Sequence, residues 1–170
     1  MSGGALAIYL NDHLAGSVAA LELIEGLLAN ESGQPLEQIL IGLRQEITQD
    51  QETLRGILSQ LDGDESALKR AAAWLAEKAG RARLSLAARE HPALARLEGL
   101  ESLALGIQGK AGLWRALAAV AEQESRLGGH QFGTLEIRAV AQHAIVERER
   151  IAAAREALVQ RGGSDEAFPG

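Results

Sequence analysis

The chain has 170 residues, a length that fits one domain with a sizeable hydrophobic core. Apolar residues make up 46% of it and charged residues 24%, with only 3% aromatic residues, a composition that favours an all-helical protein. A net charge of −6 without a basic stripe argues against nucleic-acid binding, and the lack of cysteine excludes disulfides, thiolate zinc sites and cysteine nucleophiles.

The first predicted helix spans residues 5–29, where apolar side chains recur every three or four positions. Polar residues such as Asp12 and Glu22 interrupt this stretch, and no basic leader precedes it. It therefore fits neither a signal peptide nor a membrane span, and we expect a cytoplasmic protein. A second helix is predicted over residues 36–61, because Pro35 suits the first turn of a helix.

A helical connecting segment is predicted over residues 66–89, between the turn DGDES and the stop EHP. The third long helix is predicted over 93–126, the loop LGGHQFG follows it, and the last long helix is predicted over 134–160. We therefore expect a single helical-bundle domain, residues 1–161, and a flexible C-terminal tail, residues 162–170.

Two helical hairpins joined by a long helical crossover resemble the ferritin-like superfamily in the order of their elements. About eighteen helical residues in the crossover span roughly 27 Å, enough to travel back along a bundle. The resemblance covers residues 5–160 and implies an all-α four-helix bundle with ferritin-like connectivity. The segment YLNDHLAG, residues 9–16, is also similar to the opening of small bacterial helical proteins, which implies no function.

The ferritin-like resemblance raises the question of a dinuclear metal centre. Such centres use a Glu-x-x-His pair on each of two helices and one Glu on each of the other two. The sequence contains no Glu-x-x-His, and residues 102–121, the middle of the third long helix, contain neither Asp nor Glu. We therefore expect no dinuclear metal centre.

The segment LGIQGKAGLW, residues 105–114, places three glycines inside a predicted helix, namely Gly106, Gly109 and Gly112. Each glycine within a helix costs about 1 kcal/mol relative to alanine. The segment lacks the spacing and the preceding strand of a phosphate-binding loop. We expect these glycines to permit close packing, against the small residues around Gly16 in the first helix or against another subunit. A ligand cavity is the alternative use.

Lys110, in the same segment, points into the middle of the apolar arc of its helix. Inward polar positions on the other helices complete an expected interior polar cluster, which consists of His13, Ser17, Asp50, Lys110, His143 and Arg150. Folding the hairpins about loop centres at residues 33 and 130 places all six within a few turns of mid-bundle. Because a buried charge is tolerated only when it is paired, we expect Lys110 to pair with Asp50, with Glu46 as the alternative.

This cluster has two interpretations. In the structural one, it is a satisfied salt bridge that fixes helix register. In the functional one, it is a small-ligand site or a mononuclear metal site, with His13, Asp50 and His143 as the metal ligands. A lysine beside these residues would repel a metal cation, which favours the structural interpretation.

We expect a soluble homo-oligomer that acts as an interaction or scaffold protein, not an enzyme, and that needs no cofactor. No Ser/His/Asp arrangement has informative spacing, and the helices lack the basic faces that bind membranes or DNA. Arginines on the last helix alternate with glutamates, as on an exposed or interfacial face. The alternative is a metal-binding or redox protein that holds one metal ion in its interior His/Asp cluster.

Overall fold

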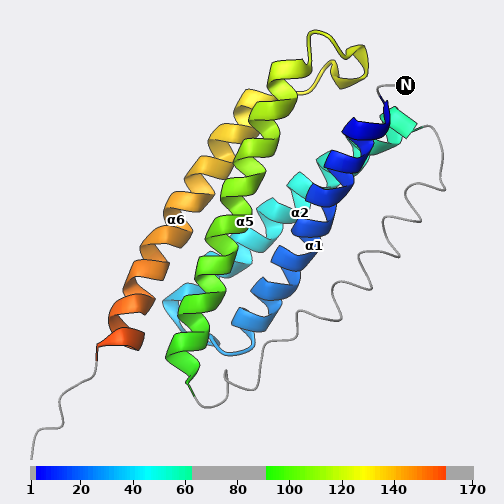
Figure 1. Cartoon of the computed structure of the whole chain (residues 1–170). Helices are drawn as coiled ribbons and strands as arrows, with labels where there is room; N and C mark the ends of the chain where they lie inside the picture. The colour runs from blue at the N-terminus through cyan, green and yellow to red at the C-terminus, as the bar shows by residue number, and fades with distance from the viewer. Residues whose placement is uncertain (1–2, 63–90, 160–170) are drawn as a thin grey trace, which may run out of the picture.

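The computed structural model describes residues 3–62 and 91–159, and all regular secondary structure in these ranges is helical (Figure 1). The four long helices are α1 (Gly3–Leu28), α2 (Pro35–Asp62), α5 (Pro92–Val120) and α6 (Phe132–Leu158), and a short 3₁₀ helix, η1, spans Ser125–Leu127. The expected all-α four-helix bundle is confirmed. The predicted connecting helix, 66–89, and the predicted tail, 162–170, lie outside the described residues.

Proline sets two of the helix starts. Pro35 and Pro92 are the first residues of α2 and α5, where a missing backbone N–H costs nothing. The predicted end of the third long helix was wrong, because α5 ends at Val120 and not at residue 126. The Glu124 side chain accepts a hydrogen bond from the backbone N–H of Arg126, and this cap starts η1 and turns the chain inward.

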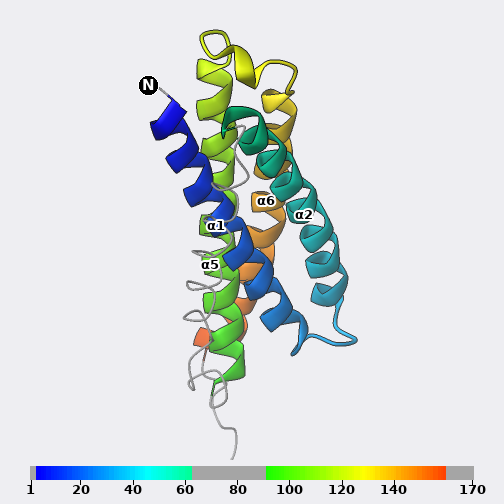
Figure 2. The same ribbon diagram turned by 90° about the vertical axis from the view of Figure 1, so that its right-hand side faces the viewer.

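The two hairpins, α1 with α2 and α5 with α6, pack against each other mainly through α1 and α5, which cross at an angle (Figures 1 and 2). The loop between α1 and α2 is at the same end of the bundle as the start of α5 and the end of α6. Ion pairs close this end: Arg96 Nε donates to the buried Glu31 carboxylate at 2.6 Å, and Arg96 Nη1 to Glu156 at 2.7 Å. At the other end, Arg126 donates to the carbonyl oxygen of Leu61 at 3.2 Å.

The hydrophobic core is divided into two clusters along the bundle axis. One lies towards the α5–α6 loop and is centred on residues such as Leu14, Ile57 and Trp114. The other lies towards the α1–α2 loop and contains residues such as Ile24 and Leu103. On each of the four long helices, a polar residue lies between the members of the two clusters. These four residues form a polar layer at mid-bundle that consists of Ser17, Asp50, Lys110 and Gln142.

No helix among the described residues is both long and apolar enough to cross a bilayer.

Candidate functional site

An ion pair between α2 and α5 lies at the centre of this polar layer. Lys110 Nζ donates to Asp50 Oδ2 at 2.5 Å, the pair that the charge pattern predicts. Arg138 of α6 donates to the other Asp50 oxygen, and Lys110 also donates to Gln142 Oε1. Gln142 Nε2 in turn donates to Glu46 Oε2 at 2.7 Å. We call these five residues the central network.

The charges of the central network balance, since two cations face two carboxylates. Asp50 is 3% exposed and Gln142 1%, so the hydrogen bonds replace water that these groups lose on folding. Burial lowers the pKa of Lys110, and the neighbouring Asp50 carboxylate opposes this effect. The network joins α2, α5 and α6 at one level of the bundle.

A second polar contact ties α1 to α2 at about the same level. Gln51 Nε2 donates to Ser17 Oγ at 2.9 Å, and Ser17 Oγ donates to the carbonyl oxygen of Leu14 at 2.6 Å. His13 lies one turn earlier on α1, with its ring edge-on to that of Tyr9 at a centroid distance of 4.7 Å. Partial burial lowers the pKa of His13, and nearby Asp12 partly opposes the shift.

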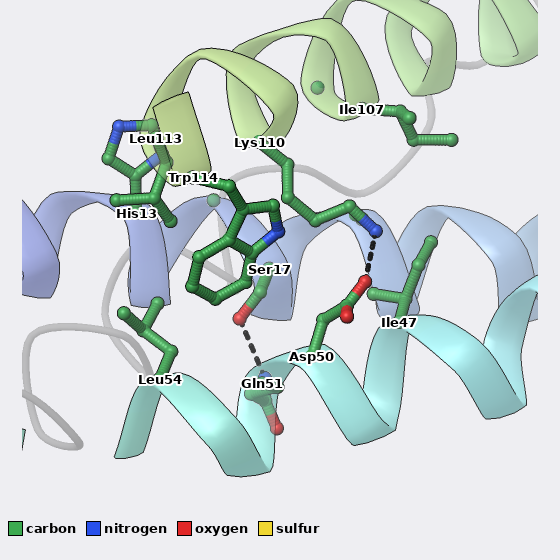
Figure 3. Close-up of a pocket in the computed structure, with 13 residues that line it drawn as sticks. His13, Ser17, Ile47, Asp50, Gln51, Leu54, Ile107, Lys110, Leu113 and Trp114 are labelled. Atoms are coloured by element: carbon green, nitrogen blue, oxygen red, sulfur yellow. Dashed lines mark hydrogen bonds and ion pairs between the residues drawn. The ribbon is translucent and has the colours of Figure 1, made fainter. Parts of the chain in front are cut away.

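A cavity of about 70 Å³ lies beside these polar groups, between α1, α2 and α5 (Figure 3). Its polar lining consists of His13, Ser17, Asp50, Gln51, Lys110 and Trp114. Its apolar lining includes Ile47, Leu54, Ile107 and Leu113. Gly16 and Gly106 also line it and are exposed, so the cavity opens to the surface between α1 and α5. We call it the α1/α5 cleft.

Trp114 contributes an unusual group to this cleft. Its side chain is 1% exposed, and its indole N–H has no hydrogen-bond acceptor among the described residues. In Figure 3 the indole nitrogen lies on the edge of the ring that faces Lys110 and Asp50. Buried polar groups are normally paired, because burying an unpaired donor costs about 1–3 kcal/mol.

His143 and Arg150, two expected members of the cluster, lie elsewhere. His143 follows the buried Gln142 by one residue, which rotates it about 100° around α6 and leaves it partly exposed. Arg150 instead pairs with Glu147 on the same helix, with Arg150 Nη2 and Glu147 Oε1 2.7 Å apart. The assumed loop centre at residue 130 was wrong, because the contact between Lys110 and Gln142 puts the centre near residue 126. This correction changes the position of His143 along the bundle axis, relative to α5, by about two helical turns.

The three expected metal ligands, His13, Asp50 and His143, are not brought together. In the two described ranges, no group of three His, Cys, Asp or Glu side chains is arranged to hold a metal ion. Both carboxylate oxygens of Asp50 already accept hydrogen bonds from cations, one from Lys110 and one from Arg138. Those cations occupy the place that a metal would need.

The expected close packing of the glycines against the first helix is not observed within the part of the chain that the structure describes. A Cβ added at Gly16, Gly106, Gly109 or Gly112 would meet no heavy atom within 4 Å, and all four residues are exposed. Gly16 and Gly106 line the α1/α5 cleft at its opening, whereas Gly109 and Gly112 do not line it. Gly99, by contrast, permits close packing, because a Cβ there would lie 2.9 Å from Leu27 Cδ2.

The outer face of α6 is unusually apolar. Five of its exposed apolar side chains lie in one line, those of Ile137, Val140, Ala144, Ile151 and Leu158, which we call the α6 stripe. At 100° per residue these five side chains lie within an arc of about 60°, opposite the buried face of the helix. The exposed fractions of Ile137 and Leu158 are 73% and 65%.

Arg138, Gln142 and Trp114 were missed as parts of the site by reasoning from the sequence. Arg138 and Gln142 are four residues apart on α6 and therefore share one face, a spacing that could have suggested a paired role. No sequence signal marks the indole N–H of Trp114 as unpaired, because its surroundings come from three helices.

Comparison with known proteins adds no relative: no family model, curated protein or solved structure matches the chain.

Proposed function

We propose that this chain is a non-catalytic interaction protein, ferritin-like in the order of its helices but without a dinuclear metal centre, which self-associates through the α6 stripe. The observation that carries the proposal is the alignment of five exposed apolar side chains on the outer face of α6. Single exposed apolar residues are common on protein surfaces, but an aligned series is typical of a surface that binds another protein.

The stripe has the size and periodicity of a helix–helix interface. The 27 residues of α6 extend about 40 Å. Ile137, Ala144, Ile151 and Leu158 follow one another at seven-residue intervals, the repeat by which two helices pack along a common seam. Arg148 and Arg155 lie at the edge of the same arc, where their stems can cover apolar surface while their charged groups stay in water.

Light scattering coupled to size-exclusion chromatography tests this proposal on the full chain, whose monomer mass is 18.0 kDa. We expect an oligomer of defined mass for the wild type, and a monomer for the double variant Ile137→Glu/Ile151→Glu. Each buried carboxylate should weaken association by at least about tenfold. The control is Gln108→Glu, which places one added carboxylate on an exposed position of α5 and should leave the mass unchanged.

A wild type that stays monomeric at about 100 μM, a concentration at which a micromolar interface is occupied, would contradict the proposal. So would a double variant that keeps the wild-type mass and helical content. Circular dichroism of the variants separates loss of assembly from loss of folding.

A further inference from the structure

The α1/α5 cleft is distinct from the α6 stripe, and its chemistry points to a ligand of its own. It combines apolar walls, an opening at Gly16 and Gly106, and a buried indole N–H without an acceptor among the described residues. Pockets for small molecules have this composition, with a few polar groups fixing orientation on a mostly apolar wall.

The buried polar atom of the cleft that lacks a partner among the described residues is a donor. The indole of Trp114 has one donor and no acceptor. The Lys110 ammonium has three N–H donors, of which Asp50 and Gln142 occupy two. The Ser17 hydroxyl already donates to Leu14 and accepts from Gln51. A ligand that complements this lining therefore supplies an acceptor.

Charge argues for a neutral ligand. Lys110 and Arg138 are balanced by Asp50 and Glu46, so the central network has no surplus charge for an ion to neutralise. An anion in the cleft would also lie near the Asp50 carboxylate, which lines it. A cation would lie near the ammonium of Lys110.

Size limits how much of the ligand is enclosed. The volume of about 70 Å³ is about half that of an engineered apolar cavity that encloses benzene. A small ring or a short alkyl carbonyl group therefore enters in part, and the remainder lies in the opening between Gly16 and Gly106. The indole nitrogen is covered by its neighbours, so an acceptor reaches it through the side-chain adjustment that is common at binding sites.

We propose that the α1/α5 cleft binds a small, neutral, largely apolar molecule through one hydrogen-bond acceptor, with the indole N–H of Trp114 as the donor. Ile47, Leu54 and Leu113 pack against its apolar part. This site does not depend on self-association through α6, so the two proposals fail separately.

Pyridine and benzene test the proposal, because they share a shape and differ in one acceptor. The ¹⁵N-labelled full chain is titrated with each at pH 7.5, where pyridine is neutral, and the indole N–H resonance of Trp114 is followed. The Trp114→Phe variant assigns this resonance against that of Trp74. We expect a saturable shift with pyridine and roughly tenfold tighter binding of pyridine than of benzene, the effect of one hydrogen bond.

Two leucine substitutions on α5 locate the site. Gly106→Leu narrows the opening of the cleft and should weaken pyridine binding at least about tenfold. Gly109→Leu is the matched control, because Gly109 is an exposed glycine of the same helix that does not line the cleft, and it should bind like the wild type. Neither glycine has a neighbour within 4 Å of an added Cβ, so both variants should fold.

Three results would overturn the proposal. One is the absence of a saturable shift with pyridine up to about 50 mM, because a specific site should bind a molecule of this size more tightly than that. Another is equal affinity for pyridine and benzene. The third is an equal effect of the leucine at positions 106 and 109, which would place the binding outside the α1/α5 cleft.

Discussion

Replacing Lys110 by Met tests whether the central network stabilises the bundle. The change removes one of the two cations that bind the buried Asp50 carboxylate and leaves Gln142 Oε1 without its ammonium donor. Breaking a buried ion pair typically costs 3–5 kcal/mol, and an unpaired buried carbonyl about 1–3 kcal/mol. Since Arg138 still binds Asp50, we expect the free energy of unfolding to fall by about 3 kcal/mol, near the lower end of the first range.

Urea unfolding followed by far-ultraviolet circular dichroism measures this loss, with tryptophan fluorescence as a second probe of two-state behaviour. Domains of this size are stable by roughly 5–15 kcal/mol, so the variant should remain folded without urea. The control is Arg115→Met on the same helix. Arg115 is 67% exposed and pairs with Glu136, and breaking such a surface pair should cost less than about 1 kcal/mol.

The double variant Lys110→Met/Asp50→Asn separates a specific pair from general damage to the interior. If the two residues stabilise the fold through each other, their effects on the free energy of unfolding should not add. The decrease in the double variant should be at least about 1 kcal/mol smaller than the sum of the decreases in Lys110→Met and Asp50→Asn. Two results would refute the role assigned to the pair. One is strict additivity of the decreases in the free energy of unfolding; the other is that Lys110→Met lowers it no more than Arg115→Met does.

Three further predictions concern α5 and the cleft. Gly112→Ala should raise the free energy of unfolding by roughly 0.5–1 kcal/mol, because the added methyl group meets no neighbour and glycine is a poor helix former. Gly99→Ala should instead lower it by up to about 2 kcal/mol in the same urea experiment, because its Cβ would lie 2.9 Å from Leu27 Cδ2; a gain equal to that at Gly112 would contradict the close contact. Since burial lowers the pKa of His13 in the folded chain below its ordinary 6.5, the unfolded chain binds this proton first as the pH falls. The free energy of unfolding should therefore decrease as the pH drops below about 6.5 towards the pKa of His13 in the folded chain. The variant His13→Gln should reduce this decrease. The control variant His143→Gln, which lies outside the cleft, should show the same decrease as the wild type.

The long helices could be predicted because their signals are local. Apolar spacing of three and four residues, with proline at the starts of α2 and α5, located most helix ends to within two residues. The exception is the end of α5, predicted six residues too late. The residues that follow Val120 are compatible with a helix, and what ends it is the Glu124 cap together with burial of Leu127 in the core. Burial of that kind depends on the other helices.

The candidate site was only partly predictable, for a geometric reason. The inward position of Lys110 and the pairing with Asp50 followed from helical periodicity and from the cost of an unpaired buried charge. The axial position of α6 relative to α5 depends on where the loop between them is centred. An error of four residues in that centre changed the expected position of His143 by about two helical turns. Because of the same error, Arg138 and Gln142 were not predicted to belong to the site.

The sequence by itself determined the helical class, the approximate helix ranges, the lack of Glu-x-x-His ligands and the need to pair an inward lysine. These properties depend on neighbours within one or two helical turns, which the order of residues specifies directly. Tertiary structure alone decided which polar groups meet at mid-bundle, that the glycines at positions 16 and 106 border an opening, and that the indole N–H of Trp114 has no acceptor among the described residues. Each of these depends on the rotation and axial position of helices that are far apart in the chain, and small shifts in either change which side chains are in contact.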